Sequence, residues 1–259
     1  MKQDKGNRKT IQSVENALRI LEELRRCEHA GVTELSHAVG LSKGTVYHYL
    51  ATLREQNFVE KRDNKYQLGL RPLTYGGAAR EREHLFQIAK EGVDRLARTT
   101  GETVRLVVER QGNGITLYQA TRHNRDSVRT HLGTQEELHS TAAGKAMLSV
   151  MDDERVDTIL EYNVSEQTDT ATFDVGELRS ELEEIRSRGI AFDDEEQFDG
   201  VRCVATALAT EVDNLLGAIS VNGPVESIDD ETFYKDIPQE IRNIAGVIEI
   251  NTAYLNWIE

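Results

Sequence analysis

Residues 43–52 carry polar side chains of the kinds that hydrogen-bond to phosphates and base edges. Lysine, threonine, tyrosine and histidine supply donors, acceptors and a phenol on the helical face that Val46, Leu50 and Leu53 leave free. Such a face is typical of a helix that reads the major groove of DNA. The DNA contacts expected from this region are Thr33, Ser42, Lys43, Gly44, Thr45, Tyr47, His48 and Thr52.

Two short helices joined by a tight turn must position these side chains. Gly40 occupies a helix end that favours positive φ, and Ser42 is placed to cap the next helix through its hydroxyl. An apolar set can converge between the two helices: Leu35, Val39, Leu41, Val46, Leu50 and Leu53. Upstream, Val14, Ala17, Leu18, Leu21 and Leu24 recur at helical spacing and predict a further helix. The alternative is an ordinary helical hairpin, and the agreement of cap, turn and apolar stripe favours the DNA-binding interpretation.

A β-hairpin is predicted directly after these helices. Residues 58–68 alternate in polarity around a polar turn at residues 62–64. The hairpin would form a wing beside the recognition helix. We expect Lys61, Arg62 and Lys65 at its tip to contact phosphates or the minor groove.

The charge of the chain is divided unevenly along its length. The net charge is −14, but residues 1–80 hold 14 Lys and Arg against 9 Asp and Glu, whereas residues 81–259 hold 17 against 36. A basic first part suits DNA, and an acidic remainder would point away from it. The chain has 9 lysines, 22 arginines and 45 acidic residues, a composition that resembles proteins of salt-in halophiles. In molar salt, base contacts and apolar fit would contribute more to DNA binding than counterion release.

Several function classes lack support in the sequence. No run approaches the roughly 18 apolar residues of a membrane span, and the N-terminus is polar, so we expect a cytoplasmic protein. Cys27 and Cys203 fall in different predicted domains and are expected to be free thiols. The seven histidines show no metal-binding spacing, so neither a metal site nor a cofactor is expected. A thiol enzyme using Cys203 with His139 is an alternative that no positioning motif supports.

The pattern after the wing predicts an α+β domain with a mainly antiparallel sheet. An amphipathic helix ends near residue 99. It would connect the two domains and contribute to dimerisation of the protein. Strands are expected at 103–109, 114–120, 127–132, 201–209 and 215–222, and helices at 141–150, 152–162, 175–189 and 229–253. The predicted organisation is a DNA-binding domain at 1–75, a connector at 76–100 and a second domain at 101–259.

Several stretches resemble the IclR family of winged helix-turn-helix transcription regulators. They are residues 13–21, 41–47 and 66–69 in the first domain, and 138–146, 188–196 and 200–205 in the second. Gly189, Asp193, Glu196, Cys203 and Ala205 match the spacing of the family signature, whereas the pattern weakens at 209–210 and at Asn222. The resemblance implies that the second domain is GAF-like and binds a small-molecule effector, often an organic or aromatic acid.

The resemblance also implies which residues line the effector site: Val128, Ala142, Ala143, Asp193, Cys203, Ser220 and Asn222. Alanines at a helix start would let backbone N–H groups approach a carboxylate, and Ser220 and Asn222 share one sheet face. Other roles stay open, because Cys203 could be a small core residue, His139 a helix cap and Asp193 the partner of an arginine.

The expected function is therefore that of a one-component regulator. It would be a homodimer or a dimer of dimers that binds double-stranded DNA at a palindromic operator, with effector occupancy changing the spacing of its DNA-binding domains. A constitutive DNA binder whose second domain only oligomerises is the alternative.

Overall fold

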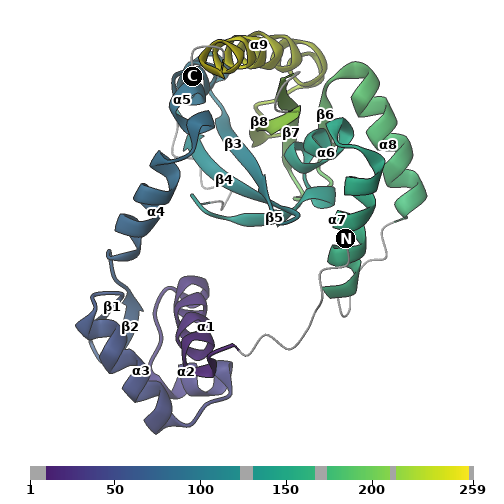
Figure 1. Ribbon diagram of the computed structural model, residues 1–259. Coiled ribbons are helices and arrows are strands. Elements are labelled where there is room, and N and C mark those ends of the chain that lie inside the picture. The colour runs from purple at the N-terminus through teal and green to yellow at the C-terminus, as the bar shows by residue number, and fades with distance from the viewer. Residues whose placement is uncertain (1–9, 123–130, 167–173, 211–213, 257–259) are drawn as a thin grey trace. The chain divides into compact units, whose positions relative to one another are not determined.

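A computed structural model describes residues 10–122, 131–166, 174–210 and 214–256 (Figure 1). The chain divides into two compact units, the first ending at Ala79 and the second beginning at Arg80. Each unit has its own hydrophobic core.

The first unit is a three-helix domain with a two-stranded wing. It contains α1 (Gln12–Cys27), α2 (Val32–Val39), α3 (Lys43–Glu55), β1 (Val59–Arg62) and β2 (Lys65–Leu68). The predicted apolar set is confirmed: Leu35, Val39, Val46 and Leu50 are buried, and Leu41 and Leu53 pack against them. On α1, the predicted Leu24 is buried and Leu21 packs against the core, but Val14 and Leu18 are exposed, and Ile20, which was not predicted, is buried.

The wing is a tight hairpin that is joined to the helices by backbone hydrogen bonds. Asp63 and Asn64 form its two-residue turn with φ of 45° and 64°, which is the geometry that favours a right-handed twist in a hairpin. Ala30 and Tyr66 exchange two backbone hydrogen bonds of 2.9 and 2.8 Å. The wing is thereby fixed beside the start of α2.

Two helices occupy the region predicted to hold one connector. They are α4 (Pro72–Glu81), in which no residue is buried, and α5 (His84–Thr100), whose apolar face lies in the core of the second unit. The break leaves Arg82 and Glu83 outside both helices.

The second unit is built on a six-stranded antiparallel sheet in the order β5-β4-β3-β8-β7-β6. Its strands are β3 (Thr103–Arg110), β4 (Asn113–Ala120), β5 (Gln135–Glu137), β6 (Ala191–Asp194), β7 (Val201–Thr210) and β8 (Asn214–Pro224). The strand predicted at 127–132 lies mostly outside the described residues, and the third strand in chain order is β5. The α+β class and the antiparallel sheet are confirmed.

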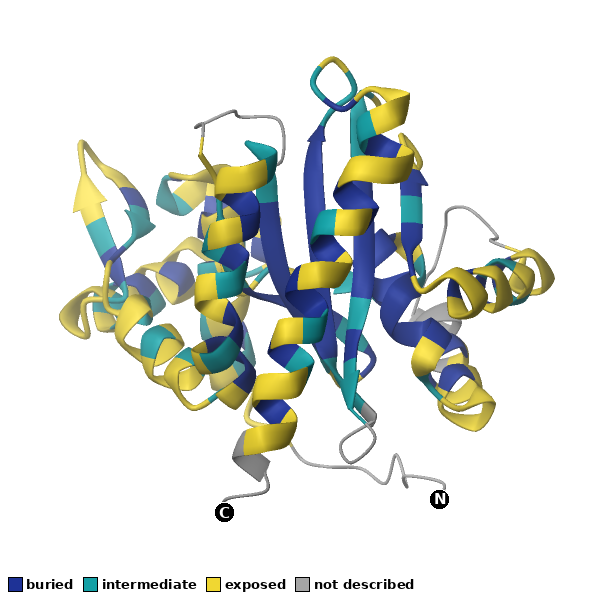
Figure 2. Ribbon diagram, turned by 90° about the horizontal axis from the view of Figure 1, so that it is seen from above, coloured by how far each residue is buried: buried dark blue, intermediate teal, exposed yellow. Residues whose placement is uncertain are grey.

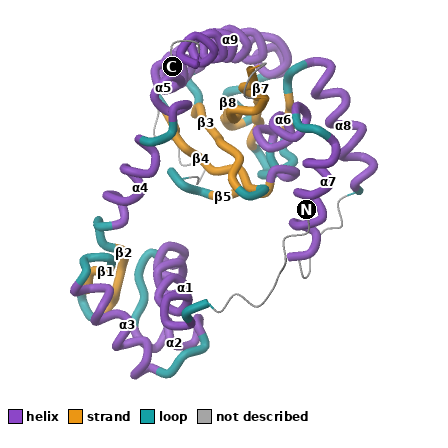
Figure 3. The backbone as a smooth tube through the Cα atoms, viewed as in Figure 1, coloured by secondary structure: helices purple, strands orange, loops and turns teal. Residues whose placement is uncertain are grey.

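Helices cover both faces of this sheet (Figures 2 and 3). One face packs against α5 and α9 (Ile237–Asn256), the latter preceded by a π-helical turn at Thr232–Asp236. The other packs against α6 (Ala142–Val150), α7 (Asp153–Glu166) and α8 (Val175–Arg188), and a 3-10 turn at Leu138–Ser140 leads into α6. Figure 2 shows buried strands beneath helices whose outer faces are exposed. Within the described residues, no helix has the length and apolar character needed to cross a membrane.

Candidate DNA interface and effector site

The recognition helix α3 begins with the predicted cap. The Ser42 hydroxyl accepts a hydrogen bond of 3.1 Å from the backbone N–H of Thr45, and the two hydroxyl oxygens are 2.8 Å apart. Gly40, at the end of α2, has the left-handed φ of 68° that the turn requires. The cap and turn are therefore confirmed, and they set the direction in which α3 leaves α2.

The polar face of α3 is open to solvent. Val46 and Leu50 are buried against the other helices, whereas Tyr47 is 56% exposed and Lys43, Gly44, His48 and Thr52 are also exposed. The Thr52 hydroxyl donates to the His48 carbonyl at 3.1 Å. The side chains predicted to meet DNA are thus available to a ligand and do not serve the core of the protein.

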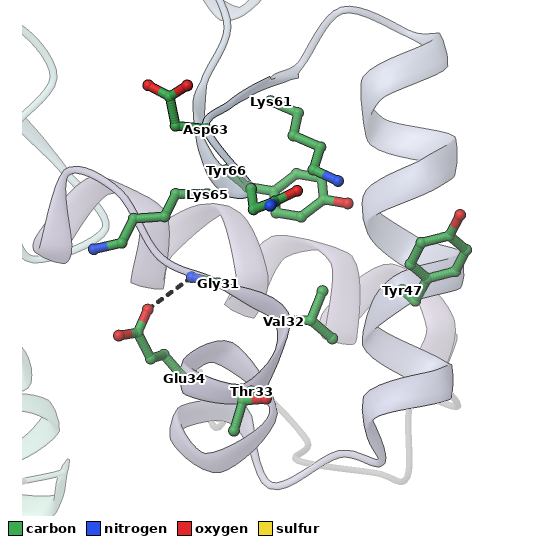
Figure 4. Close-up of a pocket in the computed structure, with 10 residues that line it drawn as sticks. Gly31, Val32, Thr33, Glu34, Tyr47, Lys61, Asp63, Lys65 and Tyr66 are labelled. Atoms are coloured by element: carbon green, nitrogen blue, oxygen red, sulfur yellow. Dashed lines mark hydrogen bonds between the residues drawn. The ribbon is translucent and has the colours of Figure 1, made fainter.

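Four of the predicted DNA-binding residues line one open groove of about 680 Å³ between α2, α3 and the wing (Figure 4). They are Thr33, Tyr47, Lys61 and Lys65. In Figure 4, Tyr47 projects from α3 on one side, and the lysines come from the wing. We call this hollow the wing groove.

The other predicted DNA-binding residues lie elsewhere on the first unit. His48 and Thr52 line a second hollow of about 310 Å³ with Arg54. Ser42, Lys43, Gly44 and Thr45 lie at the N-terminal end of α3, and Arg62 lies on the wing with its Nη2 3.5 Å from Glu60.

Two carboxylates also line the wing groove, and neither was predicted as part of the DNA interface. Glu34 accepts a hydrogen bond of 2.7 Å from the Gly31 N–H and so caps α2, and Asp63 lies in the wing turn. Glutamate at the third position of a helix is a capping signal that could have located Glu34. Since Glu34 and Asp63 offset Lys61 and Lys65, the groove is less basic than its lysines alone suggest.

Four of the predicted effector residues lie on one face of the sheet of the second unit. Asp193, Cys203 and Asn222 lie opposite one another on β6, β7 and β8, and Ser220 lies two residues from Asn222 on the same face. All four are buried. Ala142 and Ala143 are also buried, in the first turn of α6, in the cluster that contains Cys203. Val128 lies outside the described residues.

The start of α6 is held close to the turn that precedes it. The Thr141 hydroxyl accepts a hydrogen bond of 2.9 Å from the Gly144 N–H. A Cβ on Gly144 would overlap the backbone of Leu138, so this position requires glycine. His139 lies in this turn, with its Nε2 3.3 Å from Glu137, and burial lowers the pKa of the imidazole.

A continuous set of hydrogen bonds joins the polar residues on this sheet face. Asp193 accepts from the backbone N–H groups of Glu196 and Gln197, at 2.9 and 3.4 Å, and burial raises the pKa of its carboxyl. The Asn222 amide donates to the Ser220 hydroxyl at 3.0 Å. Among the described residues, the carboxylate of Asp193 therefore binds two backbone N–H groups and not the arginine that the sequence left open as its partner.

The thiol of Cys203 is not suited to nucleophilic chemistry. Burial raises its pKa to about 12, so the thiolate is scarce at neutral pH. The residue belongs to an apolar cluster. Its environment is that of a small core side chain.

Three residues that were not predicted from the sequence belong to the same set: Arg105, Glu136 and Gln197. Arg105 on β3 donates to Asn222 at 2.9 Å and to Glu136 at 3.0 Å, and the Gln197 amide donates to Glu136 at 3.0 Å. We call Arg105, Glu136, Asp193, Gln197, Ser220 and Asn222 the buried polar cluster. A lone arginine between apolar strand residues was the available signal.

Family models match both units. The model described as "IclR helix-turn-helix domain" matches residues 13–63, and "Bacterial transcriptional regulator IclR C-terminal" matches residues 77–250. The chain belongs to the IclR family of transcriptional regulators. It is therefore a regulator with a DNA-binding helix-turn-helix domain and not an enzyme.

Relatives resemble the chain over most of its length. The "Probable HTH-type transcriptional regulator ArcR" of Halobacterium salinarum is 31% identical over 252 residues, which cover 95% of each chain. The glycerol operon regulatory protein of Streptomyces coelicolor is 31% identical and covers 85% of this chain and 87% of its own.

Solved structures of IclR proteins share the fold. The IclR protein of Thermotoga maritima has a TM-score of 0.74 at 24% identity, covering 93% of this chain and 99% of its own. An IclR homologue of Microbacterium hydrocarbonoxydans, solved in complex with 4-hydroxybenzoate, also has a TM-score of 0.74, at 17% identity and with coverage of 92% and 98%.

Proposed function

We propose that this IclR-family chain is a one-component regulator whose affinity for operator DNA changes when a small organic acid binds to the second unit. The DNA contacts would come from the exposed face of α3 and from the wing, with Tyr47 and His48 reading bases and the lysines meeting phosphates. The chain would then need no partner protein to convert a metabolite signal into a change of transcription.

The buried polar cluster carries the effector part of the proposal. Elsewhere the same sheet face packs alanine, leucine and valine against α6, α7 and α8. Buried polar groups cost stability unless they are paired, and a set of them on one face indicates a site for a polar ligand. The structural neighbour bound to 4-hydroxybenzoate, an organic acid, supports this class of ligand.

A palindromic operator would match a symmetric dimer. Two copies of α3 related by a twofold axis would meet half-sites about one helical turn of DNA apart. Ile11, Val14 and Leu18 form an exposed apolar row along α1 and its N-terminal flank, which supports contact with a second copy. The effector would act by binding the DNA-competent arrangement of the oligomer more or less tightly than the incompetent one.

Fluorescence anisotropy with labelled promoter DNA tests the proposal. Binding of the full chain is measured with and without candidate acids, at 0.15 M and at about 2 M potassium chloride, because the acidic composition and the Halobacterium relative favour a salt-rich setting. We expect at least one acid to change the affinity for promoter DNA about tenfold, a typical size for allosteric coupling. If the affinity for promoter DNA is unchanged with every acid, the proposal that the protein senses an organic acid is wrong.

One observation favours a second candidate, a constitutive DNA binder. Most polar groups of the buried polar cluster already bind one another, as in a structural network. In that case DNA binding would be retained with every acid, and no acid would raise the thermal stability of the protein.

A further inference from the structure

The side chain of Arg105 is placed unusually for the middle of a sheet. It is only 3% exposed, and it lies opposite Ser220 on the face that carries Asp193, Cys203 and Asn222. A guanidinium stays charged at any physiological pH, so its burial requires compensating acceptors.

The acceptors around this guanidinium are incomplete. Nη2 donates to Asn222 and Nη1 donates to Glu136, but the buried Nε has no partner in the described part of the chain. A carboxylate commonly binds arginine through two parallel hydrogen bonds, whereas Glu136 uses only Nη1. Arg105 therefore retains donor capacity for a better-placed anion.

A second buried polar atom on this face is also unpaired. The Thr116 hydroxyl has no partner among the described residues, and Thr116 lies opposite Val107, which packs in the cluster of α6, α7 and α8. Unpaired buried groups are uncommon in folded proteins and call for an explanation such as a ligand. Two of them on one sheet face indicate a binding site for a polar ligand.

Glu136 is the component of the cluster that can leave most easily. It lies in the three-residue strand β5, which is at the edge of the sheet and, among the described strands, pairs with β4 alone. Its side chain is 15% exposed, and its carboxylate accepts hydrogen bonds from Arg105 and from the Gln197 amide. Short edge strands open at a lower free-energy cost than central strands do.

We propose that Arg105 anchors the carboxylate of the effector and that Glu136 is an internal substitute which the effector displaces. This inference rests on the proposed effector function of the second unit. The ligand class is a small monocarboxylic acid with a second oxygen, in hydroxyl, keto or phenol form, that Ser220 or Asn222 can bind. Exchange of one carboxylate for another keeps the buried cation paired.

Displacement would also alter the surroundings of the site. Glu136 accepts from Gln197, and Asp193 accepts from the N–H groups of Glu196 and Gln197, so the loop after β6 would lose one of its side-chain attachments. An occupied and an unoccupied site would thus differ in the order of β5 and of this loop, which gives the effector a structural difference to act on.

Calorimetric titration of the full chain tests the exchange. The probes are acetate, pyruvate, lactate and 4-hydroxybenzoate, each compared with its primary amide. We expect Glu136→Gln to bind at least one acid about tenfold more tightly than the natural chain does, because the competing charge is gone. The affinity for the primary amides should not increase in this variant. Glu137→Gln removes the neighbouring carboxylate of β5 and should bind like the natural chain.

A second variant distinguishes the loss of the anchor from a loss of folding. Arg105→Lys keeps the charge but loses the planar fork, and it should bind the same acid at least tenfold more weakly while retaining its circular dichroism spectrum. If Glu136→Gln gains no affinity for any acid, or if Arg105→Lys binds as the natural chain does, the inference is wrong.

DNA anisotropy on the same samples separates the two proposals. If an acid changes the DNA affinity of the natural chain, and both variants bind that acid as the natural chain does, the regulator proposal stands and the role of Arg105 is refuted. If Glu136→Gln gains acid binding through Arg105 but no acid alters DNA affinity, the anchor stands and sensing is refuted.

Discussion

The exposed face of α3 carries two kinds of side chain, whose losses should have different effects. Lys43→Ala should weaken binding to all DNA sequences, because a lysine on a phosphate contacts a charge that every sequence carries. The slope of log affinity against log salt concentration should fall in magnitude by about one unit. Tyr47→Ala should cost about 1–3 kcal/mol on the preferred site and less on its variants. Anisotropy on a panel of operator variants measures both effects.

Arg54→Ala serves as the comparison, since this residue lies near the C-terminal end of the same helix. It should leave base preference unchanged. If Lys43 and Tyr47 variants respond alike across the panel, the proposed division between phosphate and base contacts is wrong.

The sequence predicts single residues well where their partners are close along the chain. Ser42 meets its partner three residues away, so its type and position were enough to predict the cap. Arg105 contacts Glu136 and Asn222 across 31 and 117 residues, through strand register that no local pattern specifies. The buried polar cluster could therefore be only partly predicted.

At the scale of elements, Lys145 joins α6 to α8 and to the loop after β6. Its Nζ lies 2.8 Å from Glu181 and 2.5 Å from Glu196, and its side chain is 8% exposed. Burial lowers the pKa of the amine, but the two glutamates outweigh burial and raise it. The stabilisation is therefore fully present at neutral pH and is lost as the pH rises through the raised pKa.

Lys145→Met should lower the free energy of unfolding by about 1–3 kcal/mol, because it leaves Glu181 and Glu196 without their cation while both stay partly hydrated. Urea denaturation at neutral pH measures the change. Lys235→Met removes the exposed pair with Glu231 and should change stability by less than about 0.5 kcal/mol. Equal losses in the two variants would contradict the role assigned to Lys145.

Elements with strong periodicity were predicted, and those without it were missed. β7 and β8 form where the alternating runs lie, whereas β5 and β6 have three and four residues, too few to show a period. The helix α4 buries no side chain in the described structure and contains two adjacent glycines, so it shows no apolar stripe. Its existence follows from the fold and not from a sequence pattern.

At the scale of the whole molecule, the apolar row of Ile11, Val14 and Leu18 predicts self-association. Leu18 is 60% exposed in the chain described, and Leu18→Glu should shift the protein toward monomer, because a buried charge opposes contact between two copies. Light scattering coupled to size exclusion measures the mass. Val175→Glu, at another exposed apolar position, should leave the mass unchanged.

The three hydrophobic cores of the described chain share no residue. The proposed DNA-binding face of α3 lies over one of these cores, in the first unit, and Arg105 lies in the second unit, beside another. If the second unit binds an effector as proposed, natural selection could alter the DNA site without altering the effector, and the reverse. Such independence lets duplicated copies diverge into many regulators by a few surface or site changes at a time.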